Sequence, residues 1–266
     1  MSVEVAFDLG EQLKQKVRSG RKLVVPYVTC GLPTPGDFVD LYVALGRHAD
    51  AIEVGIPFSD PVMDGPVIQQ SSARALASGL TVDGCLGLIA EAVKRSPVPA
   101  VVMTYFNPVH SAGLETFAAK AANAGISGLI VPDLPFEECA ELDRALKKHG
   151  LALIQLVAPT TPGERASQLA AASRGFIYAV SRMGVTGMQD SLASAASEVV
   201  NRVKPHTDLP VLVGVGISSP ALAVEASRVA DGVIVGTAVV KRVLEEDLAG
   251  AVDLIRQMRE AVRTPG

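Results

Sequence analysis

Short runs of apolar and β-branched residues recur along the chain, and an Ala- and Leu-rich stretch with helical spacing follows each run. The runs predict strands at residues 22–29, 51–54, 99–104, 128–131, 152–157, 175–180, 210–214 and 231–235. The stretches that follow them predict helices near residues 36–48, 81–95, 115–124, 136–149, 162–173, 193–204, 219–228 and 248–262. Because the expected strands are apolar almost throughout, they indicate a parallel sheet that is buried on both faces.

A strand followed by a helix, repeated eight times, predicts an α/β fold, a single (β/α)8 TIM barrel. We expect one domain over residues 1–266, since no linker or shift in composition divides the chain, and an extra N-terminal helix at residues 8–18. The connections at 55–80 and 181–192 exceed the usual length of βα loops and are expected as two long loops at the catalytic face. The alternative is an open doubly wound sheet, which usually has about five or six strands.

Charge and cysteine content narrow the class of protein. The 266 residues include 24 Lys and Arg against 28 Asp and Glu, a net charge of −4, which disfavours nucleic acid or an anionic membrane as a partner. Cys30, Cys85 and Cys139 have no CxxC spacing, which argues against a disulfide scaffold or a thiolate zinc site. The first residues lack the pattern of a signal peptide, and no apolar run reaches the ~20 residues of a membrane span. We therefore expect a cytoplasmic protein.

Residues 51–72 are the richest segment in candidate chemistry. Glu53 interrupts an apolar strand near its C-terminal end, the end at which TIM barrels hold their active sites. Burial there raises the pKa of a carboxyl toward the range useful for proton transfer, although a structural glutamate held by a neighbouring strand is the alternative. Asp60 and Asp64 follow on the loop, where an aspartate is as often a turn former as a catalytic group.

Glycine-rich segments after the seventh and eighth expected strands predict a phosphate site. Residues 214–218 read GVGIS, and Gly236 and Thr237 follow the last strand. Glycine lets backbone N–H groups approach an anion closely, and a helix that begins at Thr237 adds its positive end. The GVTG segment at residues 184–187 could complete the site, while glycines used only for tight turns are the alternative.

The positions of lysine and histidine narrow the classes of reaction that the chain could catalyse. The lysines fall on expected helices and loops or, at Lys22, at the start of the first strand, which disfavours a Schiff-base aldolase. The four histidines do not converge, which disfavours a metal aldolase. Acid–base chemistry by carboxyl groups on a phosphorylated substrate remains.

Six motifs then carry a resemblance to a known family: IEVGIPFSDPVMDGPVIQ (52–69), MTYFNP (103–108), GLIVPDLP (128–135), YAVSRMGVTG (178–187), VGVGIS (213–218) and VGTAVV (235–240). With them, the chain resembles the tryptophan synthase alpha chain family over essentially its whole length. The resemblance implies a lyase that performs the retro-aldol cleavage of indole-3-glycerol phosphate to indole and glyceraldehyde 3-phosphate in tryptophan biosynthesis. It also implies a β-chain partner in an α2β2 assembly, with pyridoxal phosphate in the β chain and no cofactor or metal in this chain.

The resemblance assigns roles to residues as well. Glu53 is expected to be the catalytic acid–base, Asp64 to bind the indole N–H, and Asp60 to bond to Thr186 when the loops close. The substrate-binding residues that it implies are Tyr105, Tyr178, Thr186, Gly187, Gly216, Gly236 and Thr237.

Two departures from the family pattern give a further expectation. Val24 and Val215 occupy positions where we expect the family often to have Phe, so we expect altered indole affinity with catalysis retained. Two other functions stay open, a stand-alone lyase that releases free indole and a chain that is mainly an allosteric activator of a β chain.

Overall fold

The computed structural model describes residues 8–180, 192–214 and 216–263. In this part of the chain eight parallel strands pair in sequence order, and β8 pairs back with β1, so the sheet closes into a barrel. The strands are β1 (Leu23–Thr29), β2 (Ile52–Gly55), β3 (Ala100–Met103), β4 (Ile126–Ile130), β5 (Ala152–Val157), β6 (Ile177–Val180), β7 (Val211–Gly214) and β8 (Gly232–Val235). The TIM barrel is confirmed, and each strand begins and ends within two residues of its expected bounds.

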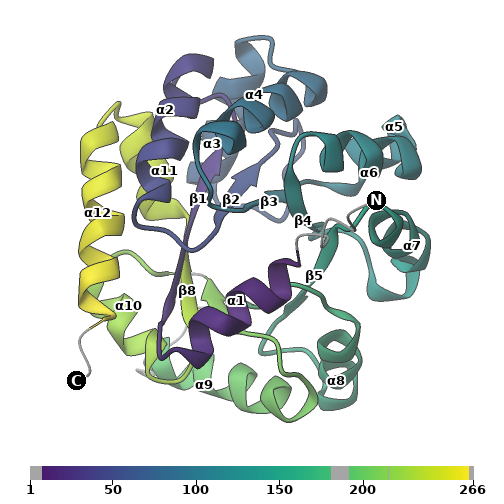
Figure 1. Cartoon of the computed structure of the whole chain (residues 1–266), viewed down its shortest axis with the longest axis vertical. Coiled ribbons are helices and arrows are strands. Elements are labelled where there is room, and N and C mark those ends of the chain that lie inside the picture. The colour runs from purple at the N-terminus through teal and green to yellow at the C-terminus, as the bar shows by residue number, and fades with distance from the viewer. Residues whose placement is uncertain (1–7, 181–191, 215, 264–266) are drawn as a thin grey trace, which may run out of the picture.

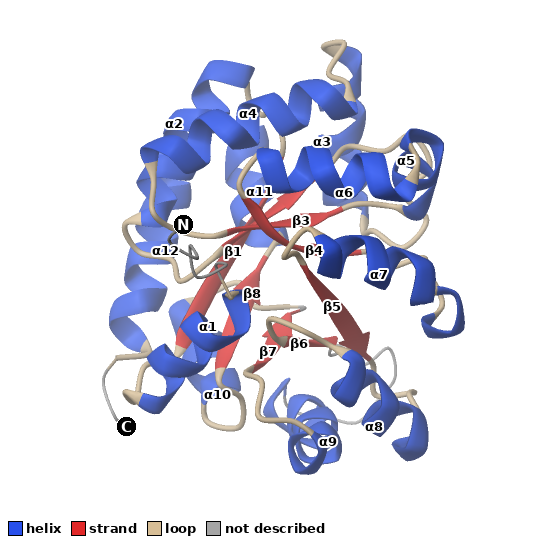
Figure 2. Cartoon of the chain, turned by 45° about the vertical axis from the view of Figure 1, so that its right-hand side comes forward, coloured by secondary structure: helices blue, strands red, loops and turns tan. Residues whose placement is uncertain are grey.

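Helices surround the ring of strands (Figure 1; Figure 2). The expected helices are α2 (Pro35–Gly46), α4 (Val82–Arg95), α6 (Leu114–Asn123), α7 (Ala140–Lys148), α8 (Gly163–Ala172), α9 (Leu192–Val203), α10 (Pro220–Ser227) and α12 (Leu248–Ala261). Side chains of Thr34, Thr81 and Ser219 accept a hydrogen bond from the first turns of α2, α4 and α10. Within the described ranges no single helix is long and apolar enough to cross a membrane, although α4 and the helix before it pass together by length and composition, with a 101° bend.

Some segments differ from the expectation. Residues 55–80 are not one long loop, because α3 (Pro66–Ala77) occupies the second half. Its buried face consists of Ser71, Ser72 and Ala75, so the helix has no apolar stripe that the sequence pattern could reveal. A second unexpected helix, α5 (Phe106–Ala112), precedes α6, and α11 (Thr237–Leu244) begins where the phosphate argument placed a helix start. The loop expected at 181–192 lies almost entirely outside the described residues.

The core has two layers, separated by the sheet. Side chains at alternate strand positions fill the barrel, and α1 (Leu9–Arg18), the expected N-terminal helix, contributes Leu9 and Leu13 to this interior layer. The positions between them face the helices. On β1 the interior layer contains Leu23 and Val25, whereas Val24 belongs to the outer layer. Val24 therefore does not face the barrel interior, and the expectation that Val at this position alters indole affinity is wrong.

A buried ionic cluster joins distant parts of the chain at the end of the barrel opposite the strand C-termini. Asp50, which precedes β2 and is fully buried, pairs with Arg259 of α12 and with Arg21 Nε at 2.7 Å and Lys16 Nζ at 3.3 Å. The amide of Val24 also donates to its carboxylate at 3.0 Å. Arg259 donates further to the carbonyl oxygens of residues 22 and 48. The cluster ties α1, β1 and α12 together around one carboxylate.

Candidate active site

Glu53 lies on β2 with its side chain inside the barrel. Its Cα partners are Tyr27 on β1 and Val101 on β3, and it is only 1% exposed. Neither of its carboxyl oxygens has a hydrogen-bond partner among the described residues. Burial and, as the smaller cause, the nearby Asp64 carboxyl raise the pKa of Glu53 from 4.5 to about 8. The carboxyl is therefore protonated near neutral pH and free to exchange its proton with a bound molecule.

Asp64 is the second carboxyl, and it comes from the loop that follows β2. Its Oδ2 accepts a hydrogen bond from the Tyr105 hydroxyl at 3.1 Å, and the same hydroxyl accepts the amide N–H of Met63 at 3.0 Å. The ring of Phe58 stacks on that of Tyr105 with the centroids 5.0 Å apart. Partial burial raises the pKa of Asp64, while the hydrogen bond from Tyr105 opposes the rise. Tyr105 thus fixes the loop and favours the ionised form of Asp64.

The third acid of the segment, Asp60, lies on the exposed part of the loop. It accepts a hydrogen bond from the Ser59 hydroxyl at 2.5 Å and does not pair with Glu53 or Asp64. Thr186 and Gly187 lie outside the described residues, as does Val215. The expected bond between Asp60 and Thr186 therefore stays a prediction.

Two tyrosines lie in the barrel near Glu53, one on the adjacent strand β1 and one on β6. Tyr178 on β6 was expected, and its hydroxyl lies over Gly214 of β7, where a Cβ would come within 2.5 Å of it. Tyr27 on β1 was not among the site residues expected from the sequence. Its hydroxyl lies over Gly55 in the same way, at 1.9 Å from where a Cβ would be. Burial raises the pKa of both hydroxyls, and Glu53 and Asp64 raise them further, so both stay protonated. The alternation of β1 could have revealed Tyr27, since it shares its face with Leu23 and Val25.

The glycines expected at the phosphate site lie at one edge of the barrel. Strands β7 and β8 are neighbours with Gly214 opposite Ile234, so Gly216 and Gly236 both follow adjacent strand ends. Gly216 has a φ of +78°, a conformation that favours glycine. Gly236 precedes α11, whose first turn receives no side-chain cap, whereas Ser219 caps the neighbouring α10. The N–H groups of α11 that begin at Thr237 are thus available to an anion.

The arrangement suits acid–base chemistry at one bound molecule. Glu53 is buried without a hydrogen-bond partner and holds its proton near neutral pH, while Asp64 is half-buried and accepts a hydrogen bond that favours its ionised form. An apolar interior lies below them and an open helix N-terminus beside them. Over residues 8–180, 192–214 and 216–263, no three His, Cys, Asp or Glu side chains are grouped to hold a metal ion.

Comparison with known proteins agrees with this geometry. The family model described as tryptophan synthase alpha chain matches residues 13–264. The tryptophan synthase alpha chains of Chloroflexus aurantiacus and Citrifermentans bemidjiense are 42% and 45% identical; the alignments cover 93% and 90% of this chain and 95% and 92% of theirs. Among solved structures, tryptophan synthase from M. tuberculosis in an open form superposes with a TM-score of 0.87 at 39% identity, covering 96% of this chain and 98% of that one. The alpha subunit from Legionella pneumophila gives 0.88 at 34% identity, with 97% and 99% covered. The resemblance inferred from the motifs is confirmed: the chain belongs to the tryptophan synthase alpha chain family.

Proposed function

We propose that the chain is a lyase that cleaves indole-3-glycerol phosphate to indole and glyceraldehyde 3-phosphate, as the alpha subunit of tryptophan synthase. The observation that carries the proposal is Glu53, a fully buried carboxyl with no hydrogen-bond partner among the described residues and a pKa of about 8. It faces Asp64 at the C-terminal end of the barrel, where this fold places its chemistry. Membership of the family supports the identity of the substrate.

The cleavage needs two proton transfers, and one acid–base can perform both. Protonated Glu53 gives its proton to C3 of the indole ring, and Asp64 accepts a hydrogen bond from the ring N–H and stabilises the positive charge that develops. The bond from C3 to the glycerol carbon then breaks, and its electron pair returns to the ring. The adjacent glycerol hydroxyl becomes the aldehyde as its proton passes to the Glu53 carboxylate, which regenerates the starting form.

We assign the substrate contacts to the mouth of the barrel. Tyr105 and Tyr178 line the space for the indole ring, and the N–H groups at Gly216, Gly236 and Thr237 bind the phosphate. The uncapped first turn of α11 supports the phosphate assignment. Thr186 and Gly187 complete the site, and Asp60 bonds to Thr186 when the two loops close over the substrate.

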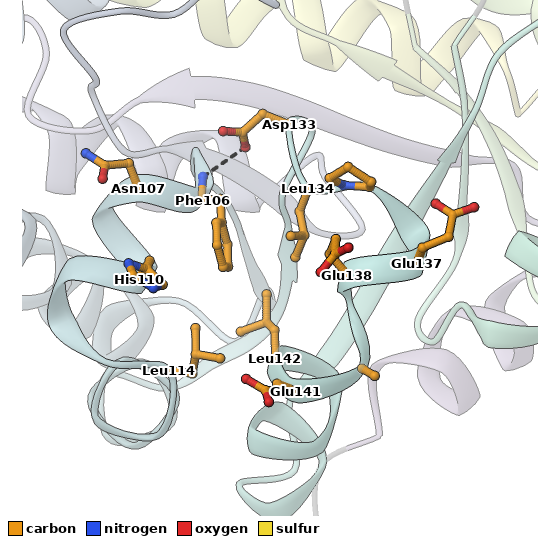
Figure 3. A pocket seen from close by; sticks show the side chains of 12 residues that line it. Phe106, Asn107, His110, Leu114, Asp133, Leu134, Glu137, Glu138, Glu141 and Leu142 are labelled. Atoms are coloured by element: carbon orange, nitrogen blue, oxygen red, sulfur yellow. Dashed lines mark hydrogen bonds between the residues drawn. The ribbon is translucent and has the colours of Figure 1, made fainter.

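A β chain is the proposed partner, in an α2β2 assembly, and the pyridoxal phosphate belongs to that chain with no cofactor in this one. A pocket of about 700 Å³ beside the barrel mouth supports a protein partner. Phe106, Leu134 and Leu142 supply apolar surface to the pocket, and carboxylates including Glu138 and Glu141 also line it (Figure 3). The pocket lies next to the loop after β2. Phe106 lines the pocket, and the preceding residue, Tyr105, accepts a hydrogen bond from the Met63 amide of that loop.

The exposed tip of the same loop also supports a partner. Val62 and Met63 are 80% and 62% exposed, and they are the large hydrophobic residues most open to solvent in the described part of the chain. A partner that covers them would lie next to Asp64, the residue that follows Met63. We further propose that residues 1–266 form one domain in the cytoplasm. The pairing of β1 with β8 supports a single domain, since it joins the two ends of the described chain in one sheet.

The test is indole release from indole-3-glycerol phosphate by the purified chain, with and without its cognate β chain. We expect measurable cleavage that the β chain strongly stimulates. High activity that the β chain does not change would favour a stand-alone lyase. No cleavage in either case, together with stimulation of the β chain's own reaction, would favour an allosteric activator and contradict the proposal.

A further inference from the structure

The hold of Tyr105 on Asp64 depends on where the Tyr105 backbone lies. The Tyr105 hydroxyl donates to Asp64 Oδ2 at 3.1 Å and accepts the amide N–H of Met63 at 3.0 Å. A displacement of the ring by about 1 Å would lengthen both contacts beyond the range of a hydrogen bond. Whatever fixes the backbone at Tyr105 therefore decides whether Asp64 keeps its donor.

The segment that follows β4 holds the backbone on both sides of Tyr105. On one side, the amide N–H of Thr104 donates to the carbonyl oxygen of Ile130 at 3.0 Å, where the pairing of β3 with β4 ends. On the other side, the amide N–H of Phe106 donates to Asp133 Oδ1 at 2.8 Å, the hydrogen bond drawn in Figure 3. The first contact joins two backbones, whereas the second depends on one side chain.

The local sequence explains why a side chain from another segment is needed here. Phe106 is the first residue of α5, and Tyr105, which precedes it, supplies no side-chain cap. Pro108 in the same turn has no N–H, so Phe106 and Asn107 carry the N–H groups that begin this helix without a partner inside it. Asp133 accepts one of them and so takes the part of a capping residue, although it is distant in the sequence.

We propose that Asp133 is a positioning residue that, by capping α5, fixes Tyr105 and so keeps the Tyr105 hydroxyl on Asp64. Its meaning for the cleavage rests on the proposed function, but the contacts from Asp133 to Asp64 do not depend on it. Without the cap, the backbone at Phe106 loses its hold and the hydroxyl leaves Asp64 for part of the time. Asp64 then lacks the donor that favours its ionised form.

The other groups that face Asp64 come from elements that Asp133 does not hold. Glu53 lies on β2, and Tyr27 and Tyr178 lie on β1 and β6. The side-chain amide of Gln69 on α3 donates to the carbonyl oxygen of Asp64 at 2.9 Å, which ties the loop from its other end. These contacts remain when the cap is removed, so the change at Asp64 passes through Tyr105.

The sign of the change separates this path from a direct effect of charge. Asp133 and Asp64 are both acidic, so removal of the Asp133 charge would by itself lower the pKa of Asp64. Loss of the Tyr105 donor raises the pKa of Asp64, because it removes a hydrogen bond to the ionised form. A rise in Asp133→Ala therefore reports the loss of the donor.

The test is a titration of the Asp64 carboxyl by ¹³C NMR in protein labelled at the aspartate side-chain carboxyls, with the signal assigned by its loss in Asp64→Asn. In Asp133→Ala we expect the Asp64 midpoint to rise by about half a pH unit, and by no more than in Tyr105→Phe. In Tyr105→Phe/Asp133→Ala no hydroxyl is left to lose, so the midpoint should stay within about 0.2 units of that of Tyr105→Phe.

The kinetics of indole release should follow the titration. In Asp133→Ala, kcat/KM for indole-3-glycerol phosphate should fall by about three- to tenfold at pH 6, the size of effect that the loss of one cap allows. The same substitution in Tyr105→Phe should cause less than about a twofold further loss.

Two controls test the role of the cap. Asp133→Asn keeps an acceptor oxygen and loses the charge, so it should prevent the rise of the Asp64 midpoint. Asp247→Ala removes an aspartate that caps α12 through the Gly250 N–H at the same distance, 2.8 Å. It should lower stability by an amount similar to that of Asp133→Ala and leave the Asp64 midpoint unchanged.

An unchanged or lower Asp64 midpoint in Asp133→Ala would overturn the inference. An equal rise in the presence and absence of the Tyr105 hydroxyl would overturn it as well, and so would a rise in Asp133→Asn as large as that in Asp133→Ala. Since the NMR titration needs no substrate, midpoints that behave as expected in a chain that does not cleave indole-3-glycerol phosphate would contradict the proposed function alone.

Discussion

Asp50 and Glu53 are three positions apart in the sequence and equally buried, at 0% and 1% exposure, yet their surroundings are opposite. Asp50 lies at the closed end of the barrel among Arg259, Arg21 and Lys16. Glu53 faces the mouth, and no described residue donates to it. Burying a carboxylate costs free energy in both places. Cations offset that cost at Asp50, whereas at Glu53 it appears as a raised pKa.

The comparison teaches that burial alone does not make a carboxyl catalytic. The partners decide whether the group holds the fold together or holds a proton for the reaction. The sign of the pH dependence follows for Glu53. Folded Glu53 keeps its proton up to about pH 8, while the unfolded chain loses it near 4.5, so stability falls as the pH rises between these values, by up to about 5 kcal/mol.

The largest effect is expected for Glu53→Gln, which removes the proton and keeps the shape. Indole release should fall by about 10²–10⁴-fold, because one residue performs both proton transfers. In urea unfolding between pH 5 and pH 9, the variant should lose less stability than the wild-type chain as the pH rises. Equal pH dependence in the two proteins would show that Glu53 carries no raised pKa.

Asp50→Asn should lower stability and leave turnover unchanged, the converse of Glu53→Gln. Arg259, only 2% exposed, would keep its charge without its main partner, so the free energy of unfolding should fall by about 3–5 kcal/mol. The turnover of the folded enzyme should remain that of the wild-type chain. The matched control is Glu11→Gln, which breaks an exposed pair with Lys14 and should cost less than about 1 kcal/mol. A loss of turnover without a loss of stability would break the comparison.

Tyr105→Phe tests how the second carboxyl, Asp64, is kept ionised. The variant removes the hydroxyl that donates to Asp64 but keeps the ring stacked on Phe58. The pKa of Asp64 should rise, and kcat/KM should fall by about tenfold or more at low pH. Steady-state kinetics from pH 5 to pH 8 measure this. Tyr42→Phe is the matched control, because it removes a buried hydroxyl that donates to the Val98 carbonyl oxygen at 2.8 Å in the outer layer. An equal loss of kcat/KM in both variants would assign the effect to packing.

The smallest effect is expected for Val24→Phe. Val24 is fully buried in the outer layer, so the larger ring should cost about 1–3 kcal/mol of stability through overpacking. The KM for indole-3-glycerol phosphate should not change, because the side chain does not face the barrel. A lower KM would restore the effect on indole affinity first expected from the sequence.

The sequence predicts the parts that repeat and the parts that obey local rules. The strands follow from their apolar runs, and Thr34, Thr81 and Ser219 cap the helices where their positions indicate. Glu53 is recognisable because a carboxyl stands out in an apolar strand. Helix α3 is not, because Ser71, Ser72 and Ala75 form its buried face and leave no hydrophobic period.

Relations between distant residues could not be predicted in this way. Asp50 and Arg259 are 209 positions apart, and nothing local to either announces the pair. The contact between the Thr29 and Ser71 hydroxyls, 2.7 Å apart, likewise depends on the packing of α3, the helix after the loop, against β1. A periodic pattern specifies which face of an element is buried, and three-dimensional closure specifies which side chains meet there.

The central claim is that Glu53 is a protonated, unpartnered carboxyl near neutral pH, and its own titration in the wild-type chain tests this most directly. The measurement is a ¹³C NMR titration of protein labelled at the glutamate side-chain carboxyls, with the Glu53 signal assigned by its loss in Glu53→Gln. We predict that this signal titrates with a midpoint near pH 8 in the absence of substrate. A midpoint near 4.5, the ordinary value of a glutamate, would contradict the account.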